Sequence, residues 1–297
     1  MIESFPAVLP HGITLSCRAC GPRLAPRVML LHGFPEGAFA WDAVMLALAA
    51  EVRCIAPNLR GFERSSAPAE VEAYRPRHLM QDIEALILQS GGPVDLLVAH
   101  DWGGAVAWNL AAMRPELMKR LLIINSPHPA TFLRELRTNP AQQAASAYMN
   151  FLCRPDAEAL LAQNDFARLW PFFERMGGLA WLDDARRARY RELWSVGLTG
   201  GLNLYRASPL RPPSPTDPLV EQTLRELQLP DTLTTSRVPT SVLWGEADHA
   251  LLPGLLQGLE HWVPDLRLTR VPDASHWIVH EQPQRVVDEI RRCLSPC

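Results

Sequence analysis

The sequence predicts an α/β fold with a mostly parallel sheet, helices on both faces and an inserted helical cap. Short apolar segments alternate with segments of helical spacing through the first 126 residues, and this alternation resumes at residue 238. Residues 127–237 lack any segment with the pattern of a strand. Short strands that alternate with helices indicate a parallel sheet with right-handed crossovers. We therefore expect a core of residues 1–126 and 238–297, with a helical cap of residues 127–237.

The core elements follow from the apolar patterns in chain order. Seven segments have the length and composition of strands, at residues 13–19, 27–31, 52–57, 94–99, 120–125, 238–244 and 266–271. Four segments have helical spacing, at residues 41–50, 79–89, 105–113 and 278–294. The cap consists of helical stretches rich in Ala, Leu, Arg and Trp, and residues 208–215 contain too much proline for regular structure.

Composition narrows the class of partners. The chain has 297 residues, 47% of them hydrophobic and 21% charged, which suits one large globular domain or a core with an insertion. The net charge is −3 and no basic cluster occurs, so we expect neither a nucleic acid nor a membrane as partner. The first residues lack a signal pattern and no apolar run could span a bilayer, which predicts a cytoplasmic location. The oligomeric state stays open between monomer and homodimer.

The cysteine pattern does not indicate a metal or redox site. The six cysteines include a single CxxC pair, Cys17 and Cys20, inside an expected strand and without a second pair. Reduced, structural thiols are the better interpretation. His276 and His280 have the spacing of a metal pair on a helix, but no third ligand is evident. We therefore predict no metal and no cofactor.

One turn organises the chemistry of the chain. Asp101 lies between an apolar segment expected to be a buried strand and an Ala-rich segment expected to be a helix, with Ala99, Gly103 and Gly104 around it. Small residues at these positions allow a sharp strand-to-helix turn that exposes one side chain at the top of a sheet. The alternative is an ordinary turn that happens to contain an aspartate.

Two later residues support the catalytic interpretation. Asp248 and His276 each follow one of the last two expected strands. The carboxyl ends of parallel strands are the edge where reactive groups gather in open α/β sheets. Alone, Asp248 could be a turn residue and His276 a helix-start residue. Together with Asp101 they have the chain order nucleophile, acid, histidine.

The chain resembles the α/β-hydrolase-fold epoxide hydrolases, which are close to the haloalkane dehalogenases, over nearly its full length. The Asp-Trp pair at the turn is typical of these two groups, and the Asn-x-Pro-His-Pro sequence favours the epoxide enzymes. The matching stretches are His32-Gly33-Phe34-Pro35-Glu36, Arg60-Gly61-Phe62, His100-Asp101-Trp102-Gly103-Gly104, Asn125-Ser126-Pro127-His128-Pro129, Trp244-Gly245-Glu246-Ala247-Asp248 and Ser275-His276-Trp277.

The chemistry of a carboxylate nucleophile agrees with this resemblance. Attack by Asp101 on a carbonyl would give an anhydride, whereas attack on an activated sp³ carbon gives an ester. Esterase, lipase and amidase activities are therefore disfavoured. His276, supported by Asp248, would activate the water that hydrolyses the ester. The backbone N–H groups of Phe34 and Trp102 would stabilise the oxyanion.

Two tyrosines separate epoxide from halide chemistry. An epoxide opens to a basic alkoxide that needs a proton donor, and tyrosine suits this role. The resemblance implies two cap tyrosines, which match Tyr148 and Tyr205. They could instead only pack within the cap. Dehalogenases of this group often carry Asn at the position of Phe34, and fluoroacetate dehalogenases carry Arg at that of Trp102, so both positions favour an epoxide.

The prediction is an epoxide hydrolase that forms vicinal diols from small apolar epoxides and water. The expected pocket residues are Trp102, Phe34, Pro35, His100 and Trp277. Glu36 could order water near the triad or bond its own loop. Two other functions stay open: a haloalkane dehalogenase with the same nucleophile, and a binding protein of this fold without turnover.

Overall fold

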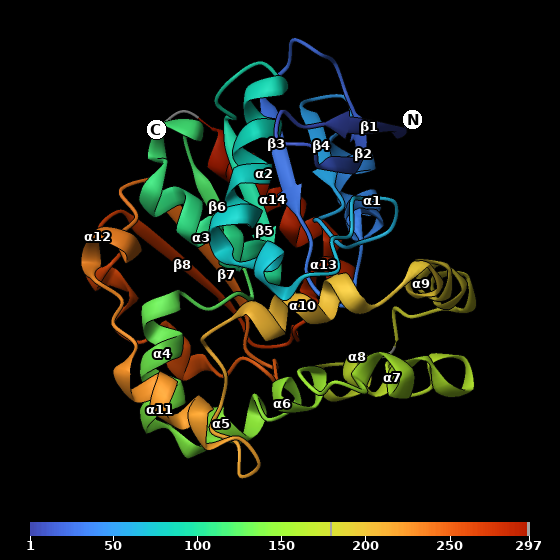
Figure 1. Cartoon of the computed structure of the whole chain (residues 1–297). Coiled ribbons are helices and arrows are strands. Elements are labelled where there is room, and N and C mark those ends of the chain that lie inside the picture. Colours follow the sequence, from blue (N-terminus) through green and yellow to red (C-terminus); the bar gives the residue numbers. More distant parts are fainter. Residues whose placement is uncertain (179, 296–297) are drawn as a thin grey trace.

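A computed structural model describes residues 1–178 and 180–295 (Figure 1). The described residues form one eight-stranded sheet in the order β1-β2-β4-β3-β5-β6-β7-β8. The first two strands pair antiparallel, as do β2 and β4, and the remaining pairs are parallel. The predicted α/β fold with a mostly parallel sheet is therefore confirmed. The strands are β1 (Glu3–Val8), β2 (Thr14–Cys20), β3 (Arg27–Leu31), β4 (Arg53–Pro57), β5 (Leu96–His100), β6 (Leu121–Ile124), β7 (Thr240–Gly245) and β8 (Leu266–Val271).

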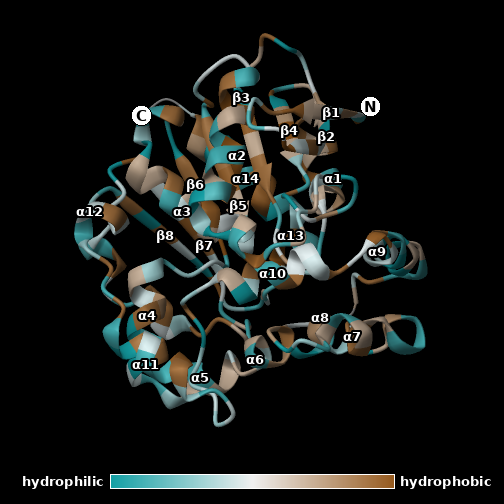
Figure 2. Cartoon of the chain, viewed as in Figure 1, coloured by the Kyte–Doolittle hydropathy of each residue, from teal (hydrophilic) through white to brown (hydrophobic). Residues whose placement is uncertain are grey.

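Helices cover both faces of the sheet, which is why its central strands are apolar throughout. Along β5, Leu97 and Ala99 belong to one hydrophobic cluster, and Leu96 and Val98 belong to the other. The first cluster includes residues of α2 (Pro76–Gln89) and α3 (Trp102–Met113). The second includes residues of α1 (Asp42–Leu48) and α14 (Pro283–Leu294). Figure 2 shows the hydrophobic colouring concentrated on these inner strands.

The structure differs from the predicted elements at both ends of the chain. Strand β1 was not expected, because Pro6 and mostly exposed residues hide its pattern; it is an edge strand, where proline is tolerated. The single helix expected at residues 278–294 is two helices, α13 (Ile278–Glu281) and α14. The break falls at Gln282 because Pro283 restricts the residue before it and lacks an N–H.

The segment between β6 and β7 is helical, as expected. Within the described part of residues 127–237 there is no strand, only an isolated bridge between Ser214 and Asp217. Figure 1 shows most of these helices gathered beyond one end of the sheet. They are α4 (Pro129–Thr138), α5 (Pro140–Ala145), α6 (Tyr148–Leu152), α7 (Ala157–Phe166), α8 (Trp170–Arg175), α9 (Asp184–Val196), α10 (Thr199–Ala207), α11 (Pro218–Glu226) and α12 (Asp231–Thr234).

Two further observations concern the cysteines and the length and apolar character of the helices. The cysteines of the described residues are free thiols, and all but Cys153 are buried. Cys297 lies outside the described residues. No helix in the described part of the chain combines the length and apolar character that crossing a membrane requires.

Helix α10 is seated on the core by a glycine contact. Gly61, in the loop after β4, has a φ of +86°, a conformation that side chains disfavour. A Cβ on Gly61 would lie 2.5 Å from the Cα of Gly200 in α10, and a Cβ on Gly200 would collide with Gly61 in turn. A Cβ on Gly201 would lie 2.9 Å from the ring of Phe34. The position of α10, and of Tyr205 within it, therefore depends on the absence of side chains at these glycines.

We expect Gly200→Ala to displace α10 from the core. The added methyl group would meet backbone, which cannot rotate away, so the loss of stability should be about 1–3 kcal/mol. Urea unfolding measures this loss. Gly178→Ala is the matched control, because a Cβ there meets no atom within 4 Å. Equal stability of the two variants would contradict a close α10 contact.

Candidate active site

Asp101 occupies a strained turn between β5 and α3. Its φ of 49° and ψ of −123° lie outside the regions that non-glycine residues favour. Neighbouring backbone fills the space around it. A Cβ on Gly33 would collide with the Asp101 side chain, one on Gly103 would lie 2.5 Å from the backbone oxygen of Leu31, and one on Gly104 would collide with Ser126. The small residues noted in the sequence are therefore what allows this turn.

The carboxylate of Asp101 has two different oxygens. The backbone N–H of Phe34 donates a hydrogen bond of 2.7 Å to Oδ1. Oδ2 lies 3.8 Å from Nε2 of His276. Trp102 is the first residue of α3, so its N–H has no partner within the helix. The Asp101 side chain is 14% exposed, so one oxygen is held while the carboxylate can still be reached.

Asp248 and His276 meet at the same edge of the sheet. Nδ1 of His276 lies 2.7 Å from Oδ2 of Asp248, and both side chains are buried. Oδ1 of Asp248 accepts the backbone N–H groups of Ala250 at 2.8 Å and Leu251 at 2.9 Å. These two hydrogen bonds hold Asp248 in place. Asp248 in turn holds the ring of His276 so that its Nε2 faces Asp101.

Asn125 completes the support of Asp248, a role that was not predicted. Its Nδ2 donates to Oδ2 of Asp248 at 2.8 Å. Its side-chain amide also bonds both the N–H of Gly245 at 2.8 Å and the carbonyl of Gly245 at 3.1 Å. The signal was present in the sequence, because Asn125 directly follows a buried strand at the edge where Asp248 and His276 lie.

The charges around His276 make it basic. Burial alone would lower the pKa of His276, but the charge of Asp248 and the hydrogen bond to it outweigh burial. Asp101 and Glu36 add to this effect, and the pKa is raised to about 9. His276 therefore carries a proton at neutral pH.

Glu36 connects the core with α9 and α13. Its Oε1 accepts the hydroxyl of Tyr190 at 2.5 Å and lies 2.6 Å from Nε2 of His280. Burial would raise the pKa of Glu36, but His280 and His100 together lower it well below its usual range. His280 thus binds Glu36 while His276 binds Asp248, so the two histidines hold different carboxylates. No group of three metal-binding side chains occurs among the described residues.

His100 and Trp277 support His276 from the core side. Their ring centroids each lie 4.8 Å from that of His276, and both residues are buried. Nε2 of His100 bonds the carbonyl of His276 at 2.9 Å, and the indole of Trp277 donates to the carbonyl of Phe173 at 3.0 Å. The sequence predicts both as pocket residues, whereas the structure places them behind the histidine and outside the cavity at Asp101.

A cavity of about 160 Å³ contains Asp101 together with both predicted tyrosines. Tyr148 comes from α6 and Tyr205 from α10, and their ring centroids are 6.2 Å apart. Trp102 lines this cavity, as expected, and its ring contacts Tyr205 edge-on at 4.9 Å. Phe34 and Pro35 line a separate, smaller recess, although the Phe34 ring still contacts Tyr205 at 5.3 Å.

Both tyrosines are held in the protonated form. Burial is the main cause that raises the pKa of Tyr148, and the nearby charges of Asp101 and Asp248 add to it. Burial likewise raises the pKa of Tyr205 well above its usual range, with further contributions from Tyr148 and Asp101. Each hydroxyl therefore keeps its proton over the whole neutral range and can donate a hydrogen bond.

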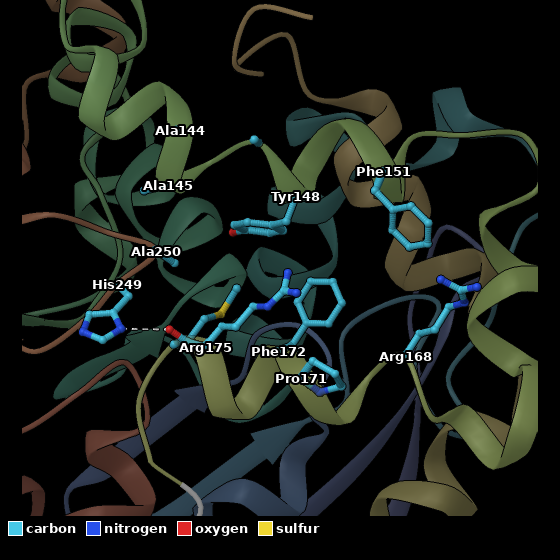
Figure 3. A pocket seen from close by; sticks show the side chains of 12 residues that line it. Ala144, Ala145, Tyr148, Phe151, Arg168, Pro171, Phe172, Arg175, His249 and Ala250 are labelled. Atoms are coloured by element: carbon cyan, nitrogen blue, oxygen red, sulfur yellow. Dashed lines mark hydrogen bonds between the residues drawn. The ribbon is translucent and has the colours of Figure 1, made fainter.

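A second cavity, of about 560 Å³, adjoins the first at Tyr148 (Figure 3). Helices α5, α6 and α8 and the loop after Asp248 surround it. The residues that line it are Ala144, Ala145, Ala147, Tyr148, Phe151, Arg168, Pro171, Phe172, Arg175, Met176, His249 and Ala250.

Comparisons with known proteins agree with this geometry. The family model described as "alpha/beta hydrolase fold" matches residues 26–283. The chain belongs to the α/β-hydrolase fold family. It is 36% identical to the AB hydrolase superfamily protein YfhM of Bacillus subtilis over 92% of this chain and 91% of that protein. It is 31% identical to epoxide hydrolase 4 of Mus musculus over 93% of this chain and 74% of that protein.

Solved structures extend the same result. The Bacillus megaterium epoxide hydrolase, in complex with an inhibitor, superimposes with a TM-score of 0.86 at 28% identity, over 98% of this chain and 99% of that one. A metagenomic protein, from a study of novel epoxide hydrolases of hot environments, gives a TM-score of 0.89 at 34% identity over the full length of both chains. The resemblance predicted from the motifs is confirmed.

We expect Asp101→Asn to lower the pKa of His276 from about 9, because one of the negative charges that raise it is removed. An NMR titration of the His276 ring measures the pKa, and mass spectrometry confirms that the substitution is retained. Asp156→Asn, at an exposed aspartate paired with Arg154, removes a charge elsewhere and should leave the pKa unchanged. An identical titration of His276 in all three proteins would contradict the coupling to Asp101.

Proposed function

We propose that this protein hydrolyses epoxides to vicinal diols through a covalent ester on Asp101. The observation that carries the proposal is a carboxylate held at a strained turn, with a histidine–aspartate pair on one side and two protonated tyrosines in the same cavity. The similarity to proteins named epoxide hydrolases supports the same activity.

The first step forms the ester. Oδ2 of Asp101 attacks one carbon of the oxirane, and the bond from that carbon to the ring oxygen breaks. Oδ1 stays bonded to the N–H of Phe34 and becomes the carbonyl oxygen of the ester. Tyr148 and Tyr205 donate hydrogen bonds, and then a proton, to the departing oxygen. That oxygen would otherwise leave as an alkoxide, which is about as basic as hydroxide, so the donor is essential.

The second step depends on a change in the charge of His276. Ester formation neutralises Asp101, so one of the charges that keep the pKa of His276 near 9 disappears. His276 can then pass its proton to the tyrosinate left by the first step and act as base toward water, with Asp248 holding its Nδ1 side. The water attacks the ester carbonyl, and the N–H groups of Phe34 and Trp102 stabilise the oxyanion. On collapse the bond to the second diol oxygen breaks, and this oxygen takes the proton that His276 removed from the water. The other water proton leaves the Asp101 carboxyl for His276, which regenerates both groups.

The alternative function as a haloalkane dehalogenase uses the same nucleophile but a different leaving group. A halide leaves as a stable anion and needs N–H donors rather than an acid. Here the position that often carries a halide-binding Asn is Phe34, and two tyrosines face the cavity. The arrangement therefore favours an oxygen leaving group, and halide release from bromoalkanes remains the measurement for the alternative.

We further propose that helices α4 to α12 act as a cap, with boundaries near residues 127 and 237. The cap supplies both tyrosines and closes the cavity over Asp101. The proposed substrate of the protein is a small epoxide with apolar groups, since most of the residues around Asp101 in that cavity are apolar. A cytoplasmic location is proposed from the free thiols and the composition.

The proposed ester can be tested by the origin of the oxygen. In one turnover with excess enzyme in ¹⁸O-water, we expect an unlabelled diol from an epoxide such as styrene oxide, because its new oxygen comes from Asp101. The label should appear in the Asp101 carboxylate, detected by mass spectrometry of the peptide. A labelled first diol would mean direct attack by water. Absence of diol from a broad epoxide panel, with ligand-induced stabilisation retained, would favour the binding-protein alternative.

Substitution of both tyrosines tests the proton donors. Tyr148→Phe combined with Tyr205→Phe should slow ester formation by about 10²–10⁴, because no acid remains for the departing oxygen. Single-turnover stopped-flow measurements follow this step.

Tyr74→Phe is the matched control for the double variant. The Tyr74 hydroxyl bonds the carbonyl of Pro68, so its loss should reduce stability by about 1 kcal/mol and leave ester formation unchanged. Full activity of the double variant would remove both tyrosines from the mechanism.

A further inference from the structure

The large cavity at α8 adjoins the proposed reaction site at Tyr148. Tyr148 lines both cavities, and its ring contacts Phe172 edge-on at 5.7 Å. Phe172 in turn contacts the ring of Phe34, whose N–H holds Asp101. A molecule whose reacting carbon lies at Asp101 and that extends past Tyr148 and Phe172 would enter the large cavity.

The wall of this cavity also touches the proposed catalytic residues from behind. The carbonyl of Met176 accepts the backbone N–H of His276 at 3.2 Å. The N–H of Ala250, which also lines the cavity, donates to Asp248 at 2.8 Å. Two residues that line the cavity are thus hydrogen-bonded to two members of the proposed triad.

The charges of the large cavity have a single sign. Arg168, Arg175 and His249 line it, and none of its described lining residues is Asp or Glu. Figure 3 shows Arg168 and Arg175 on either side of Phe172 and Pro171. His249 uses its Nδ1 on the backbone carbonyl of Arg175. The chain as a whole has a net charge of −3, so this cluster is a local exception.

The two guanidinium groups have no acidic partner. Neither makes a hydrogen bond or an ion pair with any described residue. Several other arginines of the segment between β6 and β7 are paired with carboxylates, at Arg154–Asp156, Arg186–Asp183, Arg189–Glu63, Arg191–Asp165 and Arg206–Glu158. The two that line the cavity are therefore left free to bind an anion from outside the chain.

We propose that the large cavity binds the carboxylate end of an epoxide substrate through Arg168 and Arg175. This inference rests on the proposed epoxide hydrolysis and specifies its substrate class. Between the cations and Tyr148, the walls are Ala144, Ala145, Ala147, Phe151, Phe172 and Met176, so the carboxylate is joined to the oxirane by an apolar chain. A cavity of about 560 Å³ is large enough for such a chain.

Electrostatics would also orient this substrate. Asp101, Asp248 and Glu36 lie near the reaction site, so a carboxylate that entered there would meet like charges. The two arginines hold it at the far end, which leaves the neutral oxirane at Asp101. A substrate with one anionic end therefore has one favourable direction of binding.

The experiment compares epoxy acids with their primary amides, which have nearly the same shape and no charge. For terminal epoxides of increasing chain length, we expect kcat/KM of the acid to exceed that of the amide by about fivefold at an optimal length, because exposed ion pairs contribute modestly. The preference should fall as salt is raised. A preference that is absent at every length would overturn the inference.

Charge removal identifies the residues. Arg168→Gln combined with Arg175→Gln should abolish the preference for the acid and leave kcat/KM for styrene oxide unchanged. Arg154→Gln combined with Arg225→Gln removes two charges from paired, exposed arginines of the same helical segment and serves as matched control. If the control variant also loses the preference for the acid, the effect is one of net charge in general. That result would also overturn the inference.

Binding without turnover separates this inference from the proposed function. Calorimetry of an epoxy acid with Asp101→Asn should show tighter binding than with the triple variant that also lacks both arginines. If no epoxide is hydrolysed but this difference is present, the cavity binds carboxylates and the proposed reaction fails. If epoxides are hydrolysed and the difference is absent, the reaction stands and the carboxylate site is excluded.

Discussion

The strained turn at Asp101 is the constraint on which the rest of this structure depends. A φ of 49° and ψ of −123° cost about 1–3 kcal/mol for a residue with a side chain, so surrounding structure must hold them. Glycines at 33, 103 and 104 let the neighbouring backbone approach close enough to do so. The same approach brings the N–H of Phe34 to Oδ1. Strain, close packing and the proposed oxyanion site thus have one origin.

The arrangement of charge gives an order to the proposed steps. His276 lies among three carboxylates, and together they raise its pKa to about 9 although it is buried. A protonated histidine cannot remove a proton from water, so water is not activated while Asp101 is free. When the ester forms, Asp101 loses its charge, the pKa of His276 falls, and the histidine can lose its proton and activate water. The base would therefore become competent only after the intermediate exists, which follows from the position of the charges alone.

The core of the site could be predicted because a parallel sheet brings the ends of its strands together. Asp101, Asp248 and His276 each follow a buried strand, and the structure brings them into contact. Asn125 also follows a buried strand at this edge of the sheet, but no role was predicted for it from the sequence. Tyr148 and Tyr205 came from the resemblance, because helices of the insert have no register that ties them to the sheet. His100 and Trp277 were predicted to line the pocket, whereas they pack against His276 and do not line the cavity at Asp101, and such packing leaves no trace in a motif.

The insert is attached to the same loops that carry the reactive groups. Tyr190 bonds Glu36, the indole of Trp194 donates to the carbonyl of Pro35 at 2.8 Å, and the carbonyl of Met176 accepts from His276. Hydrogen bonds therefore join α9 to the loop after β3, and join Met176, at the end of α8, to His276 of the proposed triad. The helices that would select the substrate also support the groups that would react with it. In the proposed mechanism, the selection of substrate and the geometry of the reacting groups therefore depend on the same contacts.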